Sequence, residues 1–283
     1  MKTQLLTLIG FAISLLANGQ NPNLNIKLKE IKSVELNISN GDKISKNYSF
    51  DNGKLKSIKT SDIVQLFFYN NNGTLDKTVR ENEAFGWKEI ATYSYDDNSN
   101  LVKYTNKYDE GNKSVTKTVS FSYEGSRIRA ITKKSNTPKK YVQWIDYAIQ
   151  DGKIVSESER DLNQKIISNK RIDYNEDDLV AYKGLLGDRS MDNYDYDDKN
   201  SAMLLLVQNV FGENYQTIVT LIAPHEKEFP LESMSNHNFV KFTSTKPSKN
   251  EYSNVYAYNN FDYPKSHTQY NGGYKTMVTY EYE

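Results

Sequence analysis

Three histidines, His225, His237 and His267, are the side chains of this sequence best suited to acid–base or metal chemistry. No two of them lie at the spacing that would place both on one face of a helix or strand, as a zinc site or a catalytic pair requires. We therefore interpret them as ordinary turn or surface histidines. The sequence predicts no metal site and no cofactor.

Carboxylates and serines give no stronger indication of catalysis. Acidic pairs such as Asp177 with Asp178 could act as a glycosidase acid and base, but 36 Asp and Glu residues make such pairs common by chance. No Gly-x-Ser-x-Gly segment presents a serine nucleophile. Residues 96–100, Asp-Asp-Asn-Ser-Asn, lack the glycine and glutamate of a calcium loop, so turn chemistry explains them better. We expect a protein that is not an enzyme.

The amino-terminal segment has the features of a secretory signal peptide. A single lysine precedes an apolar run over 5–16, which is about twelve residues long, whereas a membrane-spanning helix needs about twenty. Small residues follow, so we expect cleavage of 1–19 and a single mature domain over 20–283. No later apolar run is long enough to be a transmembrane helix.

Cysteine is absent, and charge is balanced. Without cysteine the protein can be neither a lipoprotein nor a disulfide-stapled domain. Together with the signal peptide, this predicts an exported periplasmic or extracellular product. Lysine plus arginine equals aspartate plus glutamate, and both signs are interspersed, which argues against a nucleic-acid or anionic-membrane partner. Tyrosine is enriched, at 22 residues, as suits strands that are half buried and half wet.

A repeated unit organises most of the chain: aromatic-x-aromatic, a cluster of Asp, Asn or Gly, then an aliphatic residue. The alternation predicts a strand and the cluster a tight turn, so each unit predicts a β-hairpin. We expect an all-β fold, a large curved antiparallel meander that curls into a half-barrel or barrel-like shape. The clear copies span 48–55, 67–75, 93–101 and 121–128, and weaker copies span 147–154, 172–179, 194–198, 256–260 and 280–282.

The segment before the fourth copy shows how the strands should face. Along 115–123 the odd positions are apolar or aromatic except Lys117, and the even positions are all serine or threonine. One face of the sheet is therefore expected to be buried and the other solvated.

The repeat is interrupted at about 199–251. Ser201 is suited to cap a short helical or irregular insertion near 200–212, whose wide apolar face predicts that it lies across an open end or the concave face of the sheet. The following segment, 216–223, is interpreted as a buried strand.

Two resemblances accompany these patterns. The unit is locally similar to the tyrosine-aspartate repeats of bacterial surface and toxin-shell proteins. Over most of the mature chain, the sequence resembles an exported bacterial family of unknown function described as having a porin-like fold. That resemblance rests on the hairpin repeats and on segments 194–200, 235–241, 256–264 and 279–282. It implies a curved, barrel-like antiparallel sheet and no activity.

Binding of an extended ligand, a glycan or a lipid, on a curved tyrosine-rich sheet is the function we expect. A row of outward-facing rings would make a stacking platform, although cross-strand packing explains the same rings. The candidate stacking residues are Tyr69, Tyr95, Tyr123, Tyr174, Tyr196 and Tyr258.

Three alternatives remain open. A structural or scaffold protein of the cell envelope would bind another protein, and an exposed apolar patch around Met203–Phe211 would favour it. An outer-membrane barrel would need a lipid-facing apolar band, which the polar strand flanks do not offer. An enzyme would need a cleft with strongly perturbed titratable groups.

Overall fold

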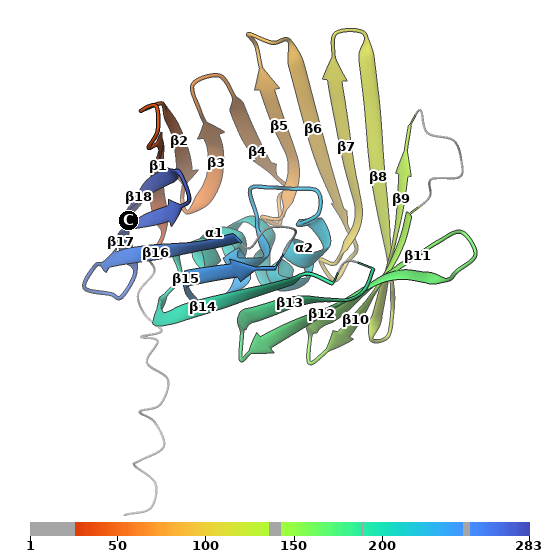
Figure 1. Ribbon diagram of the computed structural model, residues 1–283. Coiled ribbons are helices and arrows are strands. Elements are labelled where there is room, and N and C mark those ends of the chain that lie inside the picture. Colours follow the sequence, from red (N-terminus) through yellow and green to blue (C-terminus); the bar gives the residue numbers. More distant parts are fainter. Residues whose placement is uncertain (1–25, 136–142, 188, 246–249) are drawn as a thin grey trace, which may run out of the picture.

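Eighteen antiparallel strands form one closed barrel (Figure 1). The structure is a computed structural model that describes residues 26–135, 143–187, 189–245 and 250–283, so the expected signal peptide lies outside it. Each strand pairs with the next along the chain, and β1 also pairs with β18. The predicted antiparallel meander is confirmed, and the pairing of its first and last strands closes it.

The strands are six to twelve residues long and follow the chain in order around the barrel. The first half comprises β1 Leu28–Asn37, β2 Lys43–Asp51, β3 Lys54–Lys59, β4 Val64–Tyr69, β5 Leu75–Asn82, β6 Trp87–Tyr95, β7 Leu101–Glu110, β8 Lys113–Glu124 and β9 Arg127–Lys134. The second half comprises β10 Gln143–Gln150, β11 Lys153–Arg160, β12 Ile166–Asn175, β13 Asp178–Leu186, β14 Met191–Asn200, β15 His237–Ser244, β16 Asn250–Tyr258, β17 Pro264–Asn271 and β18 Tyr274–Tyr282.

The repeated unit makes the turns at one end of the barrel. In the hairpin of β2 and β3, Asn52 and Gly53 both have positive φ, 51° and 74°, which is the conformation that a two-residue turn between twisted strands requires. In the β4–β5 hairpin, Tyr69 lies opposite Leu75. The second aromatic residue of a unit and its aliphatic residue therefore face each other across their own hairpin.

Tyrosine hydroxyls join one hairpin to the next. Tyr69 donates to the backbone carbonyl of Leu55 at 2.8 Å, and Tyr123 donates to that of Leu101 at 3.0 Å. In both cases the acceptor is the aliphatic residue of an earlier unit. The recurrence of tyrosine at this position thus has a structural reason, since it ties neighbouring hairpins at the turn end of the wall.

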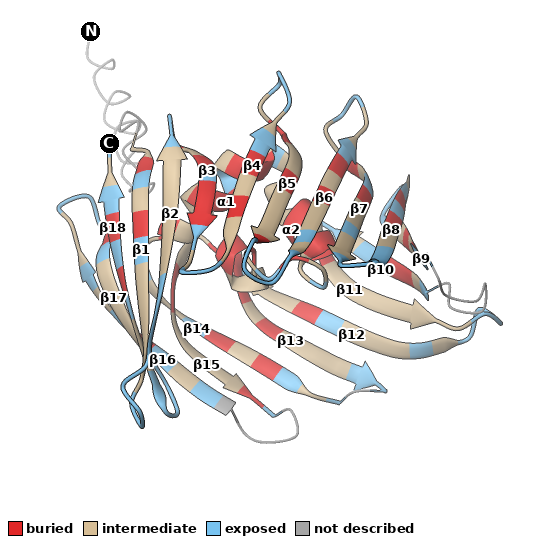
Figure 2. Cartoon of the chain, turned by 90° about the horizontal axis from the view of Figure 1, so that it is seen from above, coloured by how far each residue is buried: buried red, intermediate tan, exposed pale blue. Residues whose placement is uncertain are grey.

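Alternation along the strands separates the lumen from the outer surface. On β8, Val119 and Phe121 are buried and face inward, so Thr118, Ser120 and Ser122 face outward. This agrees with the expectation of one buried and one solvated face. Figure 2 shows buried residues on many strands and on both α-helices, whereas β2 has none.

A helical plug fills the turn end of the barrel. It consists of α1 Ala202–Phe211, a short 3₁₀ turn, α2 Tyr215–Ile222 and a second 3₁₀ turn, η3 Leu231–Met234. Both α-helices lie inside the ring of strands (Figures 1 and 2). Ser201 caps α1 by accepting a hydrogen bond from the amide of Leu204 at 3.2 Å. The predicted capped insertion inside the concave sheet is confirmed.

The predicted strand over 216–223 is wrong, because this segment forms α2. A short run of apolar residues fits a buried strand and a buried helix equally well. Inside the barrel every backbone group needs a partner, and a helix supplies its own, whereas all the wall strands are already paired on both sides. Within α2, the buried hydroxyl of Thr220 also has a partner, because it donates to the carbonyl of Gln216 at 2.8 Å.

Candidate functional site

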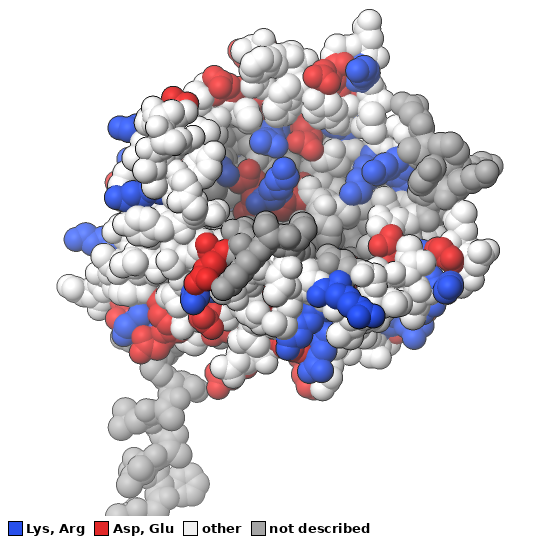
Figure 3. Space-filling view, viewed as in Figure 1, with Lys and Arg blue, Asp and Glu red and all other residues white. Residues whose placement is uncertain are grey.

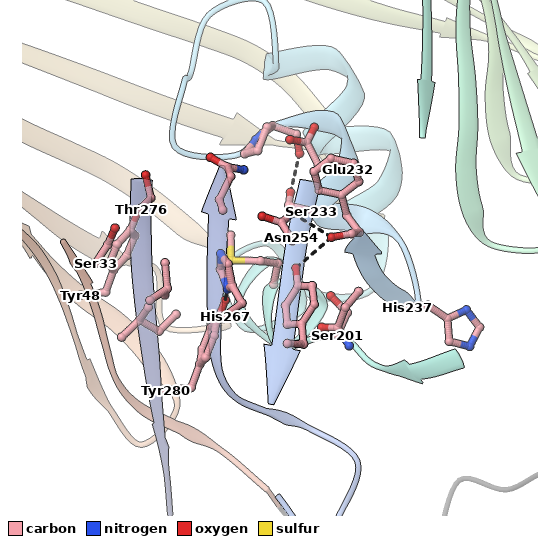
Figure 4. Close-up of a pocket in the computed structure, with 18 residues that line it drawn as sticks. Ser33, Tyr48, Ser201, Glu232, Ser233, His237, Asn254, His267, Thr276 and Tyr280 are labelled. Atoms are coloured by element: carbon pink, nitrogen blue, oxygen red, sulfur yellow. Dashed lines mark hydrogen bonds between the residues drawn. The ribbon is translucent and has the colours of Figure 1, made fainter. Parts of the chain in front are cut away.

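A pocket of about 230 Å³ lies between the plug and the wall formed by β15–β18, β1 and β2 (Figure 4). Its wall side chains come from alternate positions of adjacent strands, so the closure of the barrel assembles them. The side chains used in the argument below are Tyr48, Asn254, Tyr256, His267, Gln269 and Tyr280.

Aromatic rings form one part of the pocket wall. The rings of Tyr256 and His267 lie 4.9 Å apart, and the hydroxyl of Tyr280 is 2.9 Å from Nδ1 of His267. Burial lowers the pKa of His267 to about 4, because the charged imidazolium would lose its hydration. At neutral pH this wall is therefore uncharged.

Uncharged polar groups form the neighbouring row. Asn254, Gln269 and Thr276 lie opposite one another on β16, β17 and β18. The amide nitrogen of Asn254 donates to the carbonyl of Phe239 at 2.8 Å, but its buried Oδ1 meets no partner among the described residues. A buried acceptor left unpaired costs about 1–3 kcal/mol. An enclosed, unpaired acceptor therefore lies beside the aromatic rings of the pocket.

The plug contributes an acid to the same pocket. Among the described residues, Glu232 forms no ion pair. Burial raises the pKa of its carboxyl group. Figure 4 shows Glu232 and Ser233 on the plug side, facing the labelled wall residues. His237 also borders the pocket, but its ring points away and its Nδ1 lies 2.6 Å from Asp178.

Charged side chains gather in the hollow of the face seen in Figure 3. The loop after α2 is tied to four strands of the wall. Glu228 pairs with Lys46 of β2, and His225 lies 2.6 Å from Lys117 of β8. Between them, Glu226 accepts hydrogen bonds from two buried tyrosine hydroxyls of β6 and β7. The donors are Tyr93 and Tyr104, both at 2.9 Å.

Glu226 is the most strongly perturbed acid of this loop. Burial raises its pKa to about 7, and the two tyrosine hydroxyls oppose that shift because they bond the carboxylate. The ring of His225 stacks on Tyr104 with centroids 5.4 Å apart, and burial lowers the pKa of His225 to about 4. The contacts of Glu226 and His225 therefore fix the loop after α2 to the inner side of the wall.

The six tyrosines proposed from the sequence do not line the pocket. Five pack against the core, and the hydroxyls of four of these five bond the wall or the plug. Tyr174 donates to the carbonyl of Ile154 at 3.1 Å, and Tyr196 accepts from Ser235 at 2.9 Å. Tyr258 donates to Asp197. The buried hydroxyl of Tyr95 meets no partner within the described ranges. Tyr69 and Tyr123 bond the wall as described above.

Sequence reasoning missed the pocket residues Asn254 and Gln269. Its interpretation of His267 as a turn or surface histidine is wrong, because the ring is largely buried in the pocket wall on β17. A signal for them exists, because Asn254-x-Tyr256 and His267-x-Gln269 place polar groups at inward positions where other strands carry apolar residues. Their convergence with the plug depends on strands that are adjacent only in the folded barrel.

Neither a metal site nor a membrane-spanning helix is found in the described part of the chain. Its His, Asp and Glu residues form no group of three that could hold an ion. None of its helices is long and apolar enough to cross a bilayer.

Comparisons with known proteins found similar structures only. No known protein family matches the chain, and no curated protein does. A solved porin-like protein from Bacteroides uniformis is similar, at 14% identity and a TM-score of 0.46, over 90% of this chain and 98% of that one. A porin-like protein from Bacteroides vulgatus is similar at 10% identity and a TM-score of 0.42, over 91% and 99%. The likeness to tyrosine-aspartate repeats stays a prediction.

Proposed function

We propose that this protein is an exported, non-catalytic binding protein that holds one sugar residue of a glycan in the pocket beside β16–β18. The observation that carries the proposal is the buried, unpartnered Oδ1 of Asn254 in a pocket with aromatic walls. A sugar hydroxyl would donate to that oxygen, and the apolar face of a sugar ring would pack on Tyr256 or Tyr280.

The composition of the pocket favours a glycan over a lipid chain. Gln269, Thr276 and Ser33 add amide and hydroxyl groups to the lining. An alkyl chain would cover these groups without bonding them, at a cost of about 1–3 kcal/mol for each buried group left unpaired. The volume of about 230 Å³ is below the roughly 300–1,000 Å³ of most small-molecule sites, which favours a single ring over a longer segment.

The position of α1 weakens the scaffold alternative. Its residues Leu206, Val207, Val210 and Phe211 are buried inside the barrel, so they form no exposed apolar patch of the kind that would favour a scaffold. A stacking role for the six tyrosines of the turn end remains a prediction, but the hydroxyl contacts of five of them support a structural role.

The outer surface supports a barrel that faces water. The outward positions of β7 are Lys103, Thr105, Lys107 and Asp109, next to a row of serine and threonine on β8. Lysine facing the middle of a bilayer costs about 2–4 kcal/mol. We therefore favour a periplasmic or extracellular location over insertion in the outer membrane.

The test is calorimetric titration of a panel of neutral and acidic oligosaccharides into the mature protein. We expect at least one to bind, and Gln269→Leu to weaken it about tenfold, which corresponds to about 1.4 kcal/mol. Thr268→Val is the matched control, because Thr268 is the adjacent residue on the outward face of β17. Absence of binding across the panel, or equal losses in both variants, would contradict the proposal.

A further inference from the structure

The lining of the pocket contains an acid and no base that could pair with it. The structure describes all the lining residues, and among them there is no lysine or arginine, while Glu232 is the one acid. His267 is uncharged at neutral pH, because burial lowers its pKa to about 4. His237 points away from the pocket and lies against Asp178. The charge that faces the pocket is therefore negative when Glu232 is ionised.

The carboxyl group of Glu232 has no cationic partner within the described ranges. The hydrogen bond that it accepts comes from its own backbone amide. Burial raises its pKa, and the negative charge of Asp192 on β14 raises it further, because both disfavour ionisation. Carboxyl groups perturbed in this way, when they face a cavity, are candidates for a functional role. The pocket thus presents an acid whose ionised form lacks a counter-charge.

Tyrosine rings lie around this acid. Burial raises the pKa values of Tyr194 and Tyr252, and the charge of Glu232 raises both further, so the acid lies near β14 and β16. Tyr256 of β16 and Tyr280 of β18 belong to the pocket lining itself. The face of a tyrosine ring attracts a cation placed within about 6 Å of its centroid. A carboxylate among such rings is suited to bind an ammonium group.

A neighbouring acid shows the same combination already occupied. Glu228, in the loop after α2, pairs with the ammonium group of Lys46 on β2. That ammonium group also lies 5.1 Å from the centroid of the Tyr48 ring, and Tyr48 is part of the pocket lining. Here the chain itself supplies the cation that a carboxylate and a wall tyrosine bind together. No described lysine or arginine takes the corresponding place beside Glu232.

We infer that the pocket takes an amino sugar, whose ammonium group pairs with Glu232 beside the rings of Tyr256 and Tyr280. An ammonium group donates charge-assisted hydrogen bonds to a carboxylate, which are stronger than those between neutral groups. An N-acetylated sugar carries no charge and would leave the carboxylate without a counter-ion. The sugar part of this inference rests on the proposed function, whereas the ammonium site itself does not.

The first experiment measures selectivity for the free amine. The glucosamine trisaccharide and its fully N-acetylated form are titrated calorimetrically at pH 6, where sugar amines are largely protonated, into wild type, Glu232→Gln and Glu213→Gln. Glu213 is the matched control, because it is an exposed acid of the plug outside the pocket lining. We expect wild type and Glu213→Gln to bind the amine form about tenfold more tightly than the acetylated form. Glu232→Gln should bind both forms about equally.

Two outcomes of this experiment would overturn the ammonium site. One is wild type that binds the amine form no more tightly than the acetylated form, which would leave the proposed function standing. The other is a preference for the amine form that survives in Glu232→Gln. The comparison within wild type decides the matter even if Glu232→Gln does not fold, which circular dichroism reveals.

The second experiment separates the ammonium site from the proposed function. Cadaverine, a diamine without a sugar ring, is titrated into the same three proteins. We expect weak binding to wild type and Glu213→Gln that Glu232→Gln loses. If cadaverine binds in this way but neither trisaccharide binds, the sugar part and the proposed function are overturned together, and the ammonium site is supported. Cadaverine binding that is equal in all three proteins would overturn the ammonium site.

Discussion

The two sides of the barrel use the same strand alternation for different purposes. On the β4–β9 side, the buried inward residues include apolar Phe67, Ala91 and Phe121 as well as polar Gln65 and Thr78. Phe211 and Phe229 of the plug contact Tyr93 and Phe67, with ring centroids 6.4 and 6.3 Å apart. Aromatic contacts therefore fix the plug to this side.

The β15–β18 side places polar groups at the corresponding inward positions. Asn254, His267 and Gln269 face the plug there, and a pocket remains between wall and plug. Tyr256 and Tyr282 still donate to backbone carbonyls, as tyrosines do on the other side. The difference therefore lies in the residues between the tyrosines, which decide whether the plug packs against the wall or leaves a polar cavity.

Removing the plug's contact with the packed side should have the largest effect. Phe211→Ala is expected to lower the free energy of unfolding by about 3–5 kcal/mol, because the ring is 1% exposed and its loss leaves a cavity. Urea denaturation followed by circular dichroism measures the change. Phe261→Ala is the control, since Phe261 is 50% exposed and should change stability little. A loss below 1 kcal/mol in Phe211→Ala would show that the plug does not depend on this side.

Glu226 should make the packed side sensitive to pH. Its folded pKa of about 7 lies above the unfolded value of 4.5, so its contribution to stability is complete below pH 4.5 and is lost as the pH rises through 7. Ionised Glu226 should thus cost roughly 3 kcal/mol at pH 8, at about 1.4 kcal/mol per pKa unit. Glu226→Gln should gain stability relative to wild type between pH 5 and pH 8. Urea denaturation at both pH values tests this, and a constant difference would contradict it.

The histidines act in the opposite direction over the same range, so the comparison with wild type matters. The folded pKa values of His225 and His267 are about 4, below the usual 6.5, so their contribution is complete above pH 6.5 and is lost as the pH falls through 4. Wild-type stability alone combines both trends. His267→Phe should remove the part of the stability loss at low pH that arises in the pocket. It should leave unchanged the pH dependence of stability that Glu226 causes.

The smallest expected effect separates two tyrosines of the repeat. Tyr69→Phe removes a hydrogen bond to Leu55 and should cost about 1 kcal/mol. Tyr95→Phe removes a buried hydroxyl that meets no partner among the described residues, and should be neutral or stabilising. Paired urea denaturation curves measure both. Equal losses would show that the hydroxyl contact does not tie the hairpins together.

The sequence by itself determined the local structure of the wall. Turn residues such as Asn52 and Gly53 impose positive φ, and alternation as in 115–123 decides which side chains share a face. Both signals act over a few residues, so the hairpins, the meander and the capped α1 helix followed from them. Lys117 was visible as an exception in the same alternation, but the residues that surround it in the folded barrel were not.

Tertiary structure alone decided the closure of the barrel, the fold of 216–223 and the pocket. Closure depends on pairing β1 with β18, which are separated by almost the whole chain, and no local pattern encodes that contact. The 216–223 segment is apolar enough for a strand or a helix, and the interior of a closed wall selected the helix. Asn254 acquired its candidate role in the same way, because what surrounds an inward side chain depends on which distant segment packs against it.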